Sequence, residues 1–187
     1  MTNNYALFIH TKHLIGLSFL MLSISCCKKD NVDPQLPPIT QTGENTFGML
    51  VNGELYLPSQ GLFGAPAIAS DYTFNGKIAG TFRLSANRLP EDGGGSLDII
   101  FHNQIFDTGY FPLVENHPRD AICYVDTVIG LCPNVLDPNN TGYLHLTRLD
   151  TVNHIISGTF SFDMLRKKDS TRISITQGRF DLDWWRH

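Results

Sequence analysis

Hydrophobic and polar residues alternate with a period of two along most of the chain from residue 46 onward. The clearest stretches are 78–86 and 155–164, in which apolar residues and glycine occupy every second position. This period places those residues on one face of a β-strand, and one buried face is typical of antiparallel sheets. No helical period is present, and residues 59–72 are predicted to form a loop with a short helical turn. The pattern predicts an all-β domain, a β-sandwich or partly open barrel of about eight to ten strands.

Two shorter signals refine the strand pattern. Asn52-Gly53 lies between two apolar runs and predicts a hairpin turn, because both residues tolerate positive φ. Near the carboxyl end, apolar residues occupy odd positions at 173 and 175 but even positions at 180, 182 and 184. A strand that buries both sets on one side needs one extra residue between them. We therefore expect a β-bulge at Gln177-Gly178.

The first 25 residues predict export. They contain one lysine and no acid, and residues 14–25 form an uncharged run. A membrane-spanning helix needs about 20 apolar residues, so this run is too short to span a bilayer. Its length is that of the apolar core of an export signal. Residues 1–25 are therefore predicted to be a signal peptide, and a short buried helix is the alternative.

The residues at the end of this run, LSISC at 22–26, resemble the lipobox of bacterial lipoproteins. In those proteins a peptidase cuts before a cysteine that then carries the lipid. Cys26 is the predicted lipidation site, and Cys27 is the alternative because Ile24 lies three positions upstream of it. Several acyl chains on one cysteine anchor a protein firmly in a membrane. We therefore expect an outer-membrane lipoprotein that contacts membrane lipid through this cysteine, on the periplasmic face or the cell surface.

Residues 26–45 contain three prolines and no periodic pattern. They predict a lipidated N-terminus followed by a disordered, extended tether. Residues 46–187 then form a single β domain of ordinary size. Without residues 1–25 the chain has 13 basic and 18 acidic residues, a net charge of −5. A mildly acidic chain without a basic cluster argues against nucleic acid as a partner, because that binding needs Lys and Arg at the phosphates.

Two cysteines of the β domain, Cys123 and Cys132, predict a disulfide. Exported proteins keep such bonds, and cysteines nine positions apart meet across a hairpin or loop. Free thiols are the alternative, whereas a zinc site lacks further ligands nearby. The chain also lacks the HxH and HExxH spacings of metal sites and the GxSxG elbow of serine hydrolases. We therefore assign no catalytic residue, no metal and no cofactor.

Aromatic residues are the candidate ligand-binding groups. The parity of the last strand points Trp184 inward and Trp185 outward. An outward indole stacks on a sugar ring or a partner protein at little entropic cost. Trp185 and Tyr143 form the predicted platform, with Tyr72 and Tyr110 as further candidates. Packing of Trp185 against the domain itself is the alternative.

Several polar residues have two interpretations. Asp181 and Asp183 share one face of the last strand, and we expect them on its solvated face rather than as a catalytic carboxylate pair. Residues 137–142 (DPNNTG) indicate a turn rather than a calcium loop. Three Asp-Ser/Thr pairs resemble the O-glycosylation acceptors of Bacteroidota-type exported proteins, and the acceptor residues are Thr127, Thr151 and Ser170.

The two ends of the β domain resemble an uncharacterised family of Bacteroidota-type β-rich outer-membrane lipoproteins. TQTGENTFGMLVNG at the start and ISGTF and ITQGRFD near the end carry this resemblance. It implies an extracytoplasmic, lipid-anchored β domain, and it transfers no catalytic residue. The predicted function is non-enzymatic binding of a glycan, a small ligand or an envelope protein. The alternatives are a structural component of an envelope complex and a hydrolase built from loops such as 59–72 and 90–96.

Overall fold

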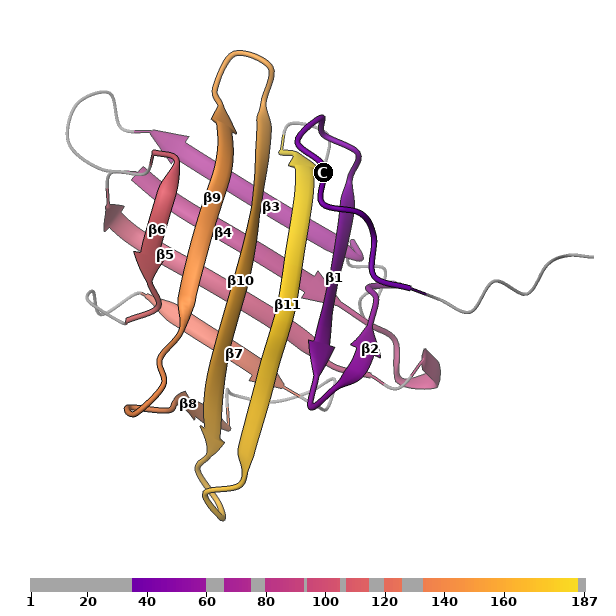
Figure 1. Cartoon of the computed structure of the whole chain (residues 1–187), viewed down its shortest axis with the longest axis vertical. Coiled ribbons are helices and arrows are strands. Elements are labelled where there is room, and N and C mark those ends of the chain that lie inside the picture. Colours follow the sequence, from indigo (N-terminus) through magenta and orange to yellow (C-terminus); the bar gives the residue numbers. More distant parts are fainter. Residues whose placement is uncertain are drawn as a thin grey trace, which may run out of the picture. The chain divides into compact units, whose positions relative to one another are not determined.

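Eleven β-strands in two antiparallel sheets make up the described chain (Figure 1). The structure is a computed structural model that describes residues 35–59, 66–74, 80–92, 94–104, 107–114, 120–125 and 133–184. The chain divides into two units, residues 1–33 and 34–187, and all described residues belong to the second.

Sheet A has seven strands. Six follow the order β2-β1-β11-β10-β9-β6, and the seventh, β8, pairs with the carboxyl-terminal end of β10. Its strands are β1 (Thr46–Val51), β2 (Glu54–Tyr56), β6 (Gly109–Pro112), β8 (Asn134–Leu136), β9 (Tyr143–Asp150), β10 (Ile155–Arg166) and β11 (Arg172–Asp183). Sheet B has four strands in the order β3-β4-β5-β7. These strands are β3 (Ile68–Phe74), β4 (Gly80–Asn87), β5 (Ser96–Gln104) and β7 (Ala121–Val125), and a 3₁₀ turn, η3 (Pro90–Asp92), precedes β5.

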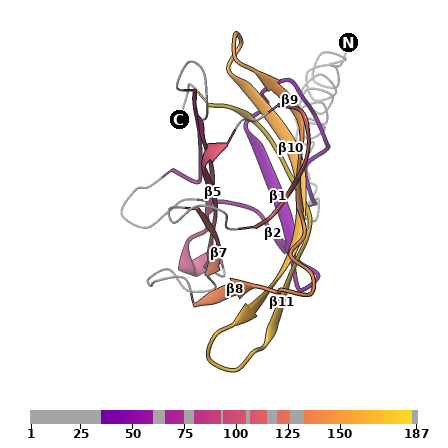
Figure 2. The ribbon, with the colours of Figure 1, turned by 90° about the vertical axis from the view of Figure 1, so that its left-hand side faces the viewer.

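The two sheets pack face to face as a β-sandwich. The strands of sheet B run diagonally behind those of sheet A (Figure 1), and the side view separates the two layers (Figure 2). Alternate side chains of both sheets meet between the layers and form one core, which includes Phe82, Leu84, Phe160 and Phe162. The all-β sandwich prediction is confirmed, although the strand number of eight to ten was slightly too low.

Strand β3 corrects the prediction of a loop through residue 72. Ile68 and Tyr72 pack against the core, and Ser70 between them is buried. These three residues alternate with outward-facing ones, as a half-buried strand requires. The small residues Ala69 and Ser70 reduce the hydrophobic contrast along this strand, so its alternation is weak in the sequence.

The predicted hairpin and bulge are both found. Asn52 and Gly53 have φ of 51° and 87° and join β1 to β2. In β11, the residue paired with Phe160 is Gly178 and the one paired with Phe162 is Ile175, so β11 has one extra residue. Gln177, with φ of 52°, takes the left-handed conformation. Gly178 is instead required for space, because a Cβ there would lie 2.3 Å from the Phe160 ring.

The outer face of sheet A, which points away from sheet B, is covered near Asp181 by the chain before β1. Five groups donate hydrogen bonds to this carboxylate: the hydroxyls of Thr40 (2.7 Å) and Ser157 (2.6 Å) and the backbone N–H groups of Thr42 (2.9 Å), Gly43 (2.9 Å) and Glu44 (3.3 Å). We call this arrangement the Asp181 clamp. The stretch 40–44, assigned to the tether from its composition, is thus attached to β11.

The clamp corrects the expectation that Asp181 is solvated. Asp181 does point outward, but it is only 1% exposed. Its cover comes from residues 137 to 141 positions earlier in the chain. Asn45, next to the clamp, accepts a hydrogen bond from the N–H of Asp183 through its side-chain oxygen (2.9 Å). The quoted motifs TQTGEN and RFD therefore contact each other, and their polar residues have a structural role.

Candidate functional site

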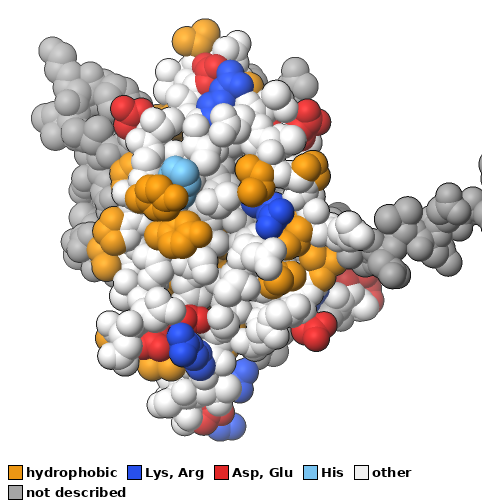
Figure 3. Space-filling view, in the orientation of Figure 1, with side chains coloured by type: hydrophobic (Ala, Val, Ile, Leu, Met, Phe, Trp, Pro, Cys, Tyr) orange, Lys and Arg blue, Asp and Glu red, His pale blue; other side chains and the backbone are white. Residues whose placement is uncertain are grey.

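The most exposed aromatic group of the described chain lies on the outer face of sheet A. Tyr110 on β6 is 70% exposed and Tyr143 on β9 is 40% exposed. The Tyr110 ring lies flat on that of His145, with centroids 3.9 Å apart and planes 5° apart, and the Tyr143 centroid is 5.6 Å from that of Tyr110. We call these three residues the aromatic cluster. A histidine among hydrophobic side chains is visible over β6 and β9 (Figure 3).

Strand pairing explains why these rings meet. Tyr143 and His145 alternate with the buried residues Leu144 and Leu146 along β9, so they point outward. In the antiparallel ladder, Tyr110 is directly opposite His145. Directly opposite residues lie on the same face, with Cβ atoms about 5 Å apart. The Tyr110 ring has one side against His145, and the residue is 70% exposed, so much of its surface faces solvent.

The same ladder extends the site across the sheet. Thr159 on β10 is opposite His145, and Arg179 on β11 is opposite Thr159. Tyr110, His145, Thr159 and Arg179 therefore form one line across four strands, which we call the cross-strand row. Ser161 lies opposite Tyr143 in the neighbouring line. This face combines a flat apolar contact on the rings with a hydroxyl and a guanidinium further along the row, as sites for polar ligands do.

The carboxyl groups with shifted pKa values are engaged in local structure. Burial raises the pKa of Asp163, but hydrogen bonds from Arg172, Ser174 and Asn140 outweigh it, so the net shift is downward. The pKa of Asp181 is lowered for the same reason: burial raises it, but the hydrogen bonds of the clamp outweigh burial. The pKa of Asp150 is lowered by hydrogen bonds from Asn153, Arg148 and Val152. Such carboxylates are poor general acids, because that role needs a raised pKa.

Away from the aromatic cluster, described residues line two shallow grooves that open to solvent. One of about 390 Å³ is lined by Leu55, Leu57, Pro58, Ser59, Arg88 and Asp92. The other, of about 270 Å³, is lined by Val114, Val135, Leu136, Pro138 and Thr141. Among the described residues, no group of three His, Cys, Asp or Glu side chains is placed to hold a metal ion.

Tyr72 is not part of the aromatic cluster. It comes from sheet B and makes an edge contact with Trp184, at a centroid distance of 6.0 Å. Trp184 packs against the core, as the parity of β11 predicted. His154 makes a second T-shaped contact with the same indole, at a centroid distance of 5.5 Å. This group closes one end of the core, so Tyr72 is unsuited to the platform that its residue type suggested.

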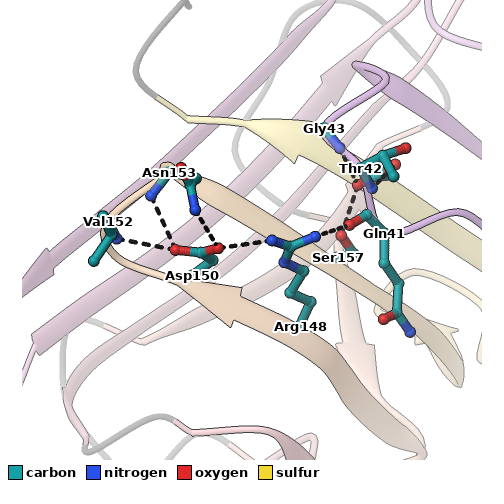
Figure 4. Close-up of polar contacts among 9 residues, drawn as sticks. Gln41, Thr42, Gly43, Arg148, Asp150, Val152, Asn153 and Ser157 are labelled. Carbon is teal, nitrogen blue, oxygen red and sulfur yellow. Dashed lines mark hydrogen bonds and ion pairs between the residues drawn. The ribbon is translucent and has the colours of Figure 1, made fainter.

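The two described O-glycosylation candidates lie at hairpin turns. Thr151 follows β9 and is exposed, next to Val152, which is 83% exposed. Asp150 accepts hydrogen bonds from Val152 N–H (3.1 Å) and Asn153 N–H (2.9 Å), and it pairs with Arg148 (Figure 4). Arg148 in turn donates to the backbone oxygen of Gln41, beside the Asp181 clamp (Figure 4).

The second candidate, Ser170, is exposed in the β10–β11 turn. Asp169 accepts a hydrogen bond from the N–H of Thr171 (3.0 Å), so both aspartates shape their turns. These contacts account for Asp-Ser/Thr pairs without modification, and glycosylation stays a prediction. The turn predicted at 137–142 is present, because Asp137 accepts the N–H of Asn139 (2.9 Å).

Several predicted residues lie outside the described chain: Cys26, Cys27, Thr127, Cys132 and Trp185. Cys123, on β7, is disulfide-bonded. His145 and Arg179 were missed as site residues. The only signal for them was their outward position on strands, and the sequence does not tell which strands are neighbours.

No protein-family model, curated protein or solved structure matches this chain. Within the described ranges, no helix is long and apolar enough to cross a membrane.

Proposed function

We propose that this protein is a lipid-anchored, extracytoplasmic binding domain that holds a carbohydrate on the aromatic cluster. The observation that carries the proposal is the Tyr110 ring, held flat on His145 and 70% exposed. The face of an aromatic ring is electronegative, and the C–H groups on the face of a sugar ring complement it. Thr159 lies opposite His145 and Ser161 lies opposite Tyr143, and their hydroxyl groups suit the hydroxyls of a sugar.

The shape of the site supports binding over hydrolysis. Glycoside hydrolysis typically uses two carboxyl groups on either side of the scissile bond, one with a raised pKa. The cross-strand row contains no carboxyl group. The shifted carboxyl groups on β10 and β11 of the same face, Asp163 and Asp181, are both buried and have lowered pKa values. An open stacking surface without acids is suited to holding a glycan chain.

The proposed lipid anchor is supported by the uncharged run at 14–25 and the cysteines directly after it. Acylation of Cys26 would hold the aromatic cluster near a membrane surface, where an envelope glycan or extracellular polysaccharide is encountered. A lipid anchor combined with an exposed aromatic cluster favours a role in retaining or presenting glycans outside the cytoplasm.

Tyr110→Ala tests the function. We expect the purified full chain, in non-ionic detergent, to bind members of an oligosaccharide array. The variant should bind them about five- to thirtyfold more weakly, since the lost ring contact is worth about 1–2 kcal/mol. The Tm should stay unchanged, because an exposed ring contributes little to stability. Val152→Ala, which removes an exposed apolar side chain at a distant turn, is the matched control. Equal binding by Tyr110→Ala and the wild type would disprove the role of the cluster.

A further inference from the structure

Arg179 is placed as the second contact point of a ligand that begins on Tyr110. The two residues lie at opposite ends of the cross-strand row, separated by the strands that carry His145 and Thr159. Three strand spacings correspond to about 14 Å between their backbones. One sugar ring stacked on Tyr110 does not reach across this distance, whereas a short oligosaccharide does.

The charge of Arg179 is not neutralised within the described part of the chain. The other three arginines on strands of sheet A are ion-paired, in the pairs Arg148–Asp150, Arg166–Asp169 and Arg172–Asp163. The guanidinium of Arg179 instead donates to the backbone oxygens of Gln177 (3.1 Å) and Pro37 (3.3 Å) and to the side-chain oxygen of Gln177 (3.4 Å). All three acceptors are uncharged.

These contacts orient the guanidinium and leave part of it available. A guanidinium has five N–H donors, so two remain after these three bonds. Two N–H groups of one arginine are what a carboxylate engages when it binds in bidentate fashion. Asp181, two residues along the same strand, does not compete, because it is 1% exposed and all its hydrogen bonds come from the clamp.

We propose that the ligand is an acidic oligosaccharide that contains uronate sugars. This inference rests on the proposed function and adds the chemical class of the glycan. One sugar ring stacks on the open side of Tyr110, the chain crosses Thr159, and a carboxylate further along pairs with Arg179. The row between Tyr110 and Arg179 contains no acid, so a protein of net negative charge still offers this polyanion an unopposed cation.

The test compares each acidic oligosaccharide with its carboxyl-reduced form, which has the same sugars without the charge. Suitable probes are oligogalacturonate, oligomannuronate and hyaluronan oligosaccharides, titrated by calorimetry into the full chain in non-ionic detergent. We expect at least one acid form to bind about tenfold more tightly than its reduced partner, the factor that a charge-assisted hydrogen bond supplies. Arg179→Gln should remove this preference, so that the acid form binds no more tightly than the reduced form.

A second variant leaves Arg179 in place. Thr159→Asp introduces a carboxylate directly opposite Arg179 and should abolish the preference for the acid form by occupying the guanidinium. Equal affinity of the wild type for acid and reduced forms, or an unchanged preference in both variants, would overturn the assignment of an acidic ligand while leaving glycan binding intact. If the wild type binds no sugar, either in these titrations or on the oligosaccharide array, the proposed function itself is overturned.

Discussion

Replacement of Asp181 by asparagine removes the charge of the clamp with almost no change in shape. The amide keeps one acceptor oxygen and presents an NH₂ group in place of the other. In its better orientation the NH₂ group replaces Oδ1, where the Ser157 hydroxyl rotates to accept a hydrogen bond. The N–H of Gly43, also bonded to Oδ1, then loses its acceptor. The variant therefore leaves one backbone N–H unsatisfied and makes the remaining bonds neutral.

These two losses set the size of the effect. A buried N–H without an acceptor costs about 1–3 kcal/mol, and hydrogen bonds to a charged group are worth about 1.5–3 kcal/mol against about 1 kcal/mol for neutral ones. Together they lower the free energy of unfolding by about 3 kcal/mol. For a domain of this size the Tm falls by roughly 6–12 °C. Asp71→Asn, at an exposed position on β3, is the matched control and should change stability by less than about 0.5 kcal/mol.

The pH dependence separates the charge from the packing. Burial raises the pKa of Asp181, but its hydrogen bonds outweigh burial and lower the pKa below that of the unfolded chain. A lowered pKa gives stability that is present above the unfolded value of about 4 and is lost as the pH falls through the folded value. Urea denaturation should therefore show a constant difference between wild type and Asp181→Asn above about pH 5 that shrinks below about pH 4. A difference that persists unchanged at pH 2, or its absence at pH 7, would refute the charged clamp.

Three further variants test other parts of the molecule. Gly178→Ala places a Cβ 2.3 Å from the Phe160 ring and should lower the free energy of unfolding, measured with urea, by about 2–3 kcal/mol. Gly53→Ala, with no atom within 4 Å of the new Cβ, should lower it by about 1 kcal/mol. Equal losses in the two variants would contradict the spatial role of Gly178. Cys123→Ser should lower stability by about 2–3 kcal/mol, and reductant should lower the Tm of the wild type to that of the variant; an insensitive wild type would contradict a stabilising disulfide. Cys26→Ala should abolish labelling by a palmitate analogue in cells, while loss of label only in Cys27→Ala would move the anchor by one residue.

Local periodicity made most of the fold predictable. The alternation in β4 and β10, the Asn-Gly turn and the change of phase in β11 all depend on neighbouring residues, and each was found where expected. Strand β3 was overlooked because its inward residues include Ser70, which has little hydrophobic contrast with its neighbours.

The site was less predictable because it depends on which strands are neighbours. Tyr110 and His145 are 35 positions apart and meet only because β6 pairs with β9. The burial of Asp181 likewise depends on a segment from the other end of the chain. Residue type suggested Tyr143 and Tyr110 correctly as surface aromatics, but it could not separate them from Tyr72, which closes the core.

The Asp181 clamp also has a mechanical consequence. Tension applied at the amino-terminal end of the described chain first loads the hydrogen bond between Arg179 and Pro37. It then reaches residues 40–44, which are fastened to β11 in the interior of sheet A. Several hydrogen bonds to one carboxylate share this force before it reaches the ladder between β1 and β11. Their rupture releases a short length of chain and leaves every strand paired. The clamp therefore protects the β1–β11 ladder from pulling at this end.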